Sequence, residues 1–382
     1  MIIRDAATTS FLSWCATKGI ETPLQLQGSH PYRFMTCETH LAPNENNRLP
    51  LVTVLLEACL IGDSPTALAD RLLLETMLGE DSDFYPYLQM LPLPLEDPMS
   101  SLLQMPRFWK DSTNYKARLD SISTWDGGQL QERLRVAEED PDKEEEKLVD
   151  PWALAVVKSR SNFLEDGRYA MTPILDMLNH DASITTKARI LKEPSKGFQK
   201  DNNSETTTLQ HNGPALELSV LNHSFKAGDE IFMSYGDLTN LDTLCDYGFV
   251  SENNPANVEC LSVRLILSPD PILVAVLADG TIAPESLASL RRVLASASDL
   301  KGKDKQQLSD FLTPLSDSNE LEVVSFLASE FDVSAKDARR GALEAATVRQ
   351  DKLVTTYLSS RAVVFEKGIE TILQKYPDLE YC

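Results

Sequence analysis

The 382-residue chain lacks any apolar run of the ~18 to 20 residues that a membrane-spanning helix requires. Its six cysteines contain no CxxC pair, which leaves a zinc ribbon or finger unsupported. They are too sparse for a disulfide scaffold, so reduced thiols in an intracellular protein are the simplest interpretation. The N-terminus lacks the basic and then apolar pattern of a signal peptide. We expect no membrane segment, no metal site and a cytoplasmic or nuclear location, with a plastid origin left open.

Positive charge is also scarce. The chain has 36 Lys and Arg against 58 Asp and Glu, which gives a net charge of −22. Such a surface repels phosphate backbones, so we expect no binding to nucleic acid. Acidity would suit a basic protein partner, although solubility alone is the simpler explanation. The length is sufficient for two or three domains with at least one sizeable core.

The first half of the chain reads as mainly helical. Residues 8–20 and 151–164 have apolar faces typical of helices, and the second begins with a proline that suits a first turn. Residues 51–79 read as helix with a break at 62–65. Residues 86–98 are rich in proline and predict an ordered loop.

The second half mixes strands with helices. Alternating apolar residues predict strands at 216–220 and, after a turn, at 231–235. Residues 192–214 carry almost no apolar side chains and predict an exposed insertion. A further strand is expected at 261–265. Helical patterns follow at 284–299, 320–331 and 335–375.

One short segment, Asp176-Met177-Leu178-Asn179-His180, places polar residues in a nearly apolar run. Buried polar side chains in such a run must find partners. Asn offers both donors and acceptors, which suits an amino-acid-like ligand that carries an ammonium and a carboxylate. Taken alone, this spacing favours a structural role.

A second segment, residues 228–236, reads Gly-Asp-Glu-Ile-Phe-Met-Ser-Tyr-Gly. Its Tyr235 follows a strand and precedes Gly236, which allows backbone or ligand to approach closely. A core tyrosine is the simpler interpretation of Tyr235 by itself. The combination is more specific, because Asn240 and then Tyr247-Gly248-Phe249 follow in order.

This set of residues resembles the SET domain of protein-lysine methyltransferases, and within it the subgroup typified by the Rubisco large-subunit methyltransferase. The resemblance implies an α+β fold of small β-sheets with a pseudo-knot, which is one of the rare threaded topologies. It implies a SET domain over 1–260 with a helical insertion at about 51–165. A mostly α-helical substrate-binding domain would follow over 261–382.

The resemblance also implies an enzyme that transfers methyl groups from S-adenosylmethionine to a lysine of a protein substrate. Asn179 and His180 would bind the methionine part of this donor, and Asp176 would support their turn. Arg160, in Ser-Arg-Ser-Asn-Phe, matches a cofactor-contacting segment with one extra residue. Tyr235 matches the catalytic tyrosine, which also borders the cofactor. Two aromatic residues would line the lysine channel, namely Tyr247 and Phe249.

The chemistry of methyl transfer to lysine fits such a channel. Only the neutral amine is nucleophilic, and with a free pKa near 10.4 its neutralisation at pH 7 costs roughly 4.6 kcal/mol. A narrow apolar channel that ends at a positive sulfonium lowers this pKa by desolvation and by like-charge repulsion. Positioning would then supply most of the rate, and no metal is needed.

The chain departs from the family pattern near its N-terminus. A family Gly-x-Gly loop corresponds to Tyr32-Arg33-Phe34-Met35, and Asn44 stands where a turn glycine is usual. Asn tolerates left-handed backbone, so we expect the turn to persist. Phe34 could crowd the cofactor. Three interpretations stay open: a shifted alignment, a loop moved outward, or a weakened affinity for the cofactor.

Two other functions remain open beside the lysine methyltransferase. One is a protein-histidine methyltransferase with the same fold. The other is a non-catalytic SET-like module that binds a protein and has a degenerate cofactor loop. In each case we expect a protein partner and a monomer, while the identity of that partner and the number of methyl groups transferred are not encoded in any motif.

Overall fold

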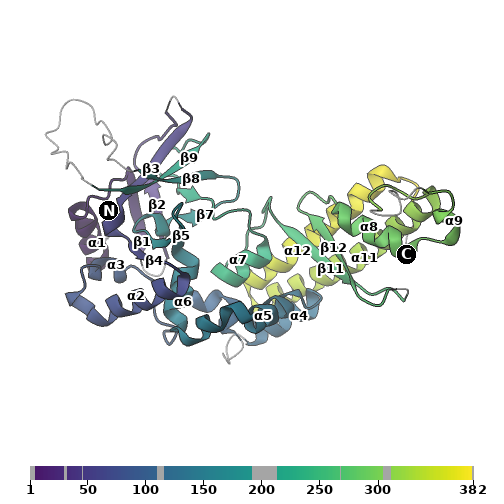
Figure 1. The fold of residues 1–382 in the computed structure, drawn as a ribbon, viewed down its shortest axis with the longest axis horizontal. Helices are drawn as coiled ribbons and strands as arrows, with labels where there is room; N and C mark the ends of the chain where they lie inside the picture. Colours follow the sequence, from purple (N-terminus) through teal and green to yellow (C-terminus); the bar gives the residue numbers. More distant parts are fainter. Residues whose placement is uncertain are drawn as a thin grey trace. The chain divides into compact units, whose positions relative to one another are not determined.

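The computed structural model describes residues 5–29, 32–44, 46–109, 116–191, 213–266, 268–303 and 311–380. The chain forms two compact units (Figure 1). Unit 1 combines Met1–Leu103 with Asp140–Asp237, and unit 2 combines Gln104–Glu139 with Leu238–Cys382. This division differs from a boundary at residue 260, because 104–139 and 238–260 belong to unit 2. None of the described helices is long and apolar enough to cross a membrane.

Unit 1 carries small sheets beside several helices. A three-stranded antiparallel sheet has the order β3-β9-β8, and a second has the order β4-β6-β5. A hairpin is formed by β1 and β2, and β7 pairs with β10 in parallel. The elements are α1 (Ala6–Thr17), β1 (Leu24–Ser29), β2 (Tyr32–Cys37), β3 (Arg48–Leu55), β4 (Leu60–Gly62), α2 (Pro65–Leu78), α3 (Tyr85–Leu88), α6 (Pro151–Arg160), β5 (Ser161–Phe163), β6 (Tyr169–Met171), β7 (Asn179–His180), β8 (Thr185–Leu191), β9 (Ala215–Leu221) and β10 (Phe232–Met233).

The helix expected over 51–79 is wrong in its first part. Residues 48–55 form strand β3, which pairs with β9. Leu51, Val52 and Val54 are all fully buried, so both faces of the strand are covered. A continuous apolar run of this length fits a buried strand as well as a helix. Beyond the break, the helix prediction is confirmed by α2.

Helix α6, which leads to Arg160, begins where its capping residues predict. The carboxylate of Asp150 accepts a hydrogen bond from the backbone N–H of Ala153 at 2.9 Å, and Pro151 occupies the first turn of α6. Helix α6 ends at Arg160, and β5 begins at the next residue. The exposed insertion expected at 192–214 lies almost wholly outside the described residues.

Unit 2 is built on two long helices, α11 and α12, that pack along each other (Figure 1). The hairpin of β11 and β12 packs on them through Val274, Val276, Phe331 and Phe365, which are all fully buried. The elements are α4 (Lys116–Trp125), α5 (Gln129–Glu139), α7 (Asn240–Tyr247), β11 (Val258–Val263), β12 (Ile272–Leu277), α8 (Pro284–Leu294), α9 (Ala297–Leu300), α11 (Asp317–Glu344) and α12 (Lys352–Lys375). The strand predicted near 261–265 is confirmed as β11, while β12 was missed.

The helix break in this unit lies further along the chain than expected. Helix α11 continues through 332–335, a stretch without Gly or Pro, so the division expected after 331 is wrong. The break falls at 345–351 instead. There Gln350 adopts left-handed backbone with φ of 53°, and Asp351 caps the next helix by accepting from the N–H of Val354.

Gly341 is required by a close helix crossing within unit 2. A Cβ atom at this position would lie 2.5 Å from Cγ of Trp125 in α4. Helix propensity alone favours Ala over Gly by about 1 kcal/mol, but overpacking of this kind costs about 1 to 3 kcal/mol. We therefore expect Gly341→Ala to lower the free energy of unfolding, measured by urea denaturation. The exposed control Glu322→Ala should change it little, and a stabilised Gly341→Ala protein would contradict the close packing.

Candidate functional site

The site in unit 1 is built on a tight, buried turn that joins β6 to β7. The backbone N–H of Asp176 donates to the carbonyl of Thr172 at 3.0 Å. Ile174 adopts φ of 71° and ψ of −48°, a conformation that a β-branched residue rarely takes. Strain of this kind costs on the order of 1 to 3 kcal/mol and persists where the surroundings over-determine the backbone. Contacts with surrounding residues therefore outweigh the backbone preference of Ile174.

Asp176 supplies those contacts. Its side chain is fully buried, and one carboxylate oxygen accepts a hydrogen bond from the hydroxyl of Tyr87 at 2.7 Å. The guanidinium of Arg160 donates to the backbone carbonyl of Asp176 at 2.7 Å and lies 3.9 Å from its carboxylate. Burial raises the pKa of Asp176 to about 6, although Arg160 and Tyr87 favour the charged form. Both Asp176 and Arg160 thus act on the turn, and the contact expected between Arg160 and the cofactor stays a prediction.

The Asn-His segment and the Tyr-Gly segment lie side by side. Strand β7 pairs in parallel with β10, with His180 opposite Met233. The backbone N–H of Tyr235 donates to Nδ1 of His180 at 3.0 Å, and the two ring centroids lie 5.1 Å apart. The hydroxyl of Tyr235 donates to the carbonyl of Leu178 at 2.7 Å. The expected convergence of residues 179–180 and 235 is confirmed.

Asn179 lies at the exposed edge of this site. Its side-chain amide donates to a carboxylate oxygen of Glu230 at 2.6 Å. Glu230 also forms a β-bridge with Thr36 of β2, so the strand that replaces the family loop runs next to it. Sequence reasoning did not single out Glu230, although it stands in the Gly-Asp-Glu-Ile turn that was noted.

The stretch that replaces the Gly-x-Gly loop is a regular hairpin strand. Phe34 pairs with Gln27 of β1 and is half-buried. The turn expected at Asn44 is present, but the left-handed backbone lies at Asn47, with φ of 54°, rather than at Asn44. Asn44 instead accepts hydrogen bonds on its side-chain oxygen from the N–H groups of Asn46 and Arg48. The short polar side chain of Asn44 thus closes the turn by accepting from its backbone N–H groups.

The predicted channel residues Tyr247 and Phe249 belong to unit 2. Their ring centroids lie 6.1 Å apart, on either side of Gly248, which ends α7 with φ of 77°. A Cβ atom at Gly248 would lie 2.7 Å from the Cβ of Gln104, so glycine is needed there for packing as well as for conformation. Burial raises the pKa of Tyr247, which keeps its hydroxyl protonated.

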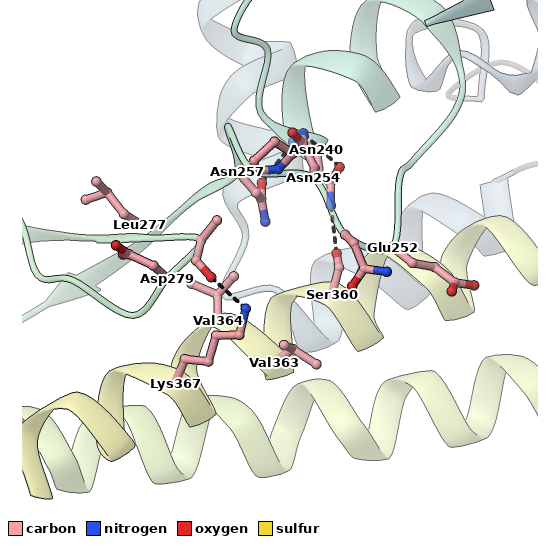
Figure 2. Close-up of a pocket in the computed structure, with 13 residues that line it drawn as sticks. Asn240, Glu252, Asn254, Asn257, Leu277, Asp279, Ser360, Val363, Val364 and Lys367 are labelled. Carbon is pink, nitrogen blue, oxygen red and sulfur yellow. Dashed lines mark hydrogen bonds between the residues drawn. The ribbon is translucent and has the colours of Figure 1, made fainter. Parts of the chain in front are cut away.

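A pocket of about 390 Å³ lies within unit 2 beside the N-terminus of α7 (Figure 2). Its floor holds three asparagines that bond to one another and to the helices. Asn240 donates to Ser360 of α12 at 2.9 Å and accepts from Asn254, while Asn257 accepts from the backbone of Asn240. Lys367 at the mouth donates to a backbone carbonyl at 3.0 Å. These amides join α7 to α12, which gives the floor a structural role.

Among the described residues, no three His, Cys, Asp or Glu side chains are grouped so that they could hold a metal ion. The five cysteines they include are free. Burial raises the pKa of Cys15 and of Cys59 to about 12, so both thiols stay protonated.

Solved structures resemble the chain over nearly its whole length. A crystal structure of the SET domain of LSMT bound to lysine and AdoHcy gives a TM-score of 0.59 at 17% identity and covers 98% of this chain and 92% of its own. Rubisco LSMT bound to sinefungin and monomethyllysine gives 0.59 at 16% identity, with coverages of 99% and 95%. Rubisco LSMT bound to AdoMet gives 0.57 at 16% identity, with the same coverages. The chain has the SET-domain fold.

The likeness lies in the fold rather than in the sequence, because no family model and no curated protein sequence matches the chain. The expected α+β architecture, with small sheets and a helical C-terminal region, is confirmed. The roles assigned to single residues of this SET fold stay predictions. The sequence did not single out Tyr87 and Leu178, two residues that bond to the site residues Asp176 and Tyr235. A lone Tyr in a proline-rich stretch and a backbone carbonyl leave no sequence pattern.

The hydrogen bond to His180 predicts a pH dependence. Burial lowers the pKa of His180 from its ordinary value of 6.5, and the neutral ring accepts from Tyr235. Between that lowered pKa and 6.5 the unfolded chain binds the extra proton, so stability falls as pH drops below 6.5. We expect an imidazole NMR titration midpoint below 6.5, and a weaker loss of stability over this range in His180→Ala. A midpoint above 6.5 would contradict this arrangement.

Proposed function

We propose that the protein transfers a methyl group from S-adenosylmethionine to a lysine side chain of a protein substrate. The observation that carries the proposal is the meeting of Tyr235 with the Asn-His segment through Leu178 and His180. It occurs in a fold shared with structures of LSMT bound to AdoMet, or to lysine and AdoHcy.

The residues at the edge of this meeting point fit such a donor. The donor carries an amino-acid end with an ammonium and a carboxylate, and it supplies an electrophilic methyl on sulfur. The carboxylate of Glu230 can accept from an ammonium, and the amide of Asn179 can donate or accept. Asn179 is exposed and Glu230 is half-buried, whereas Asp176 is buried and Arg160 donates to the turn.

Tyr235 would act through position rather than as a base. Its hydroxyl donates to the carbonyl of Leu178, which fixes the direction of the phenol oxygen. An oxygen fixed in this way can orient a lysine nitrogen for in-line attack. The fixed ring of His180 beside it holds the backbone of Tyr235 in register.

The test is the Tyr235→Phe protein, which keeps the ring and removes the hydroxyl. We expect kcat with labelled donor and protein acceptors to fall by about 10²-fold or more, the scale of a lost positioning or electrostatic contact. Donor affinity, measured by calorimetry, should stay within about threefold because the ring packing is unchanged. Tyr169→Phe, elsewhere in unit 1, is the matched control and should keep full activity.

The acceptor is found by incubating a cell lysate with labelled donor and the protein, then identifying the labelled band and residue by mass spectrometry. A label on histidine would replace the lysine assignment within the same fold. Undiminished transfer by Tyr235→Phe would remove Tyr235 from the mechanism. No donor binding at high micromolar concentration would favour the non-catalytic protein-binding module.

A further inference from the structure

Tyr87 of α3 is fully buried and reaches the site turn from the side of the first helix. Its ring stacks on Trp14 of α1 with centroids 6.3 Å apart and planes 7° from parallel, and it lies 6.2 Å from the ring of Phe11. The indole N–H of Trp14 in turn donates to the backbone carbonyl of Asp83 at 2.7 Å. The phenol of Tyr87 is therefore held in one orientation by packing.

The hydroxyl of this ring points at the turn. The Tyr87 hydroxyl donates to the carboxylate of Asp176 at 2.7 Å, while Arg160 donates to the backbone carbonyl of the same residue. Leu178, two residues further on, offers the carbonyl that accepts the Tyr235 hydroxyl. Asp176 lies in one turn of 3₁₀ helix, Leu175–Met177, which ends at Leu178, so a displacement at Asp176 is passed on to Leu178.

We propose that Tyr87 is a positioning residue for Tyr235, acting through Asp176 and the carbonyl of Leu178. The proposal rests on the proposed function only in giving Tyr235 a catalytic role. The proposed connection from Tyr87 through Asp176 and Leu178 to Tyr235, called the relay below, rests on geometry within unit 1. It connects the aromatic cluster of α1 and α3 to the hydroxyl at the reaction centre by two side-chain hydrogen bonds and one rigid turn.

Core packing alone does not account for these groups. A phenylalanine at position 87 would fill the aromatic cluster equally well, and a buried carboxylate is costly unless it is hydrogen-bonded. The groups that face Asp176 are the phenol of Tyr87, the guanidinium of Arg160, and the protonated thiols of Cys15 and Cys59. Of these groups, Tyr87 and Arg160 stabilise the charged carboxylate of Asp176. The turn therefore keeps its conformation while both are bound to Asp176.

The first test compares Tyr87→Phe with Tyr85→Phe, a substitution of the same kind in the same short helix at a half-buried ring. We expect kcat of Tyr87→Phe to fall about tenfold, the effect of one hydrogen bond that fixes a reacting group. KM for the protein acceptor should change less than twofold. Tyr85→Phe should match the wild-type protein in both quantities, and thermal unfolding of each variant checks that it is folded.

The second test uses no turnover. The hydroxyl of Tyr87 lowers the pKa of Asp176, so its removal should raise the midpoint of the Asp176 carboxyl titration, followed by ¹³C NMR, by about 1 pH unit. The acid limb of the kcat profile should move to higher pH by the same amount. In an Asp176→Asn protein, which retains an acceptor for Tyr87, the change Tyr87→Phe should no longer move that limb.

The outcomes separate the two proposals. If Tyr235→Phe loses activity and Tyr87→Phe behaves like Tyr85→Phe in kcat and in acid limb, the relay is wrong and the function stands. If the wild-type protein transfers no methyl group, the function fails. In that case an unchanged Asp176 midpoint in Tyr87→Phe overturns the relay, and a raised midpoint supports the coupling of Tyr87 to the turn.

Discussion

The site depends on one short piece of parallel β-structure. Strands β7 and β10 contribute two residues each, yet they bring together segments that are more than fifty positions apart in the chain. Two residues a strand cannot hold a pairing of this kind by backbone bonds alone. The imidazole of His180 and the hydroxyl of Tyr235 complete it, because each bonds to the backbone of the opposite segment. The residues that would do the chemistry are thus the ones that hold the strands together.

The turn before β7 is energetically unfavourable by itself, and the rest of unit 1 stabilises it. It buries the carboxylate of Asp176 and keeps Ile174 at a positive φ. Both features lower stability by themselves. An apolar residue in place of the buried carboxylate would cost less free energy. The surrounding helices supply Tyr87 and Arg160 to offset these costs. Rigid backbone at a reaction centre is what a mechanism based on position requires.

Much of this arrangement could be predicted from the sequence, and the failures have physical reasons. The start of α6 and the order of Asn179, His180 and Tyr235 were readable, because a proline, a polar pair in an apolar run and a Tyr-Gly leave local patterns. Strand β3 was misread, since an apolar run buried on both faces has no period. Tyr87 was missed because its importance arises from a partner 89 positions away.

The path of the chain between its two units has a consequence for any attempt to divide the protein. The polypeptide crosses between them after Leu103, after Glu139 and after Asp237, so each unit is assembled from two separate stretches. No uninterrupted fragment of the gene encodes either unit complete. A truncation near residue 260 would cut through β11 and remove α11 and α12, and it would leave the apolar face of α4 in water. Domain dissection would therefore call for splicing, with short linkers that bridge the excised portions.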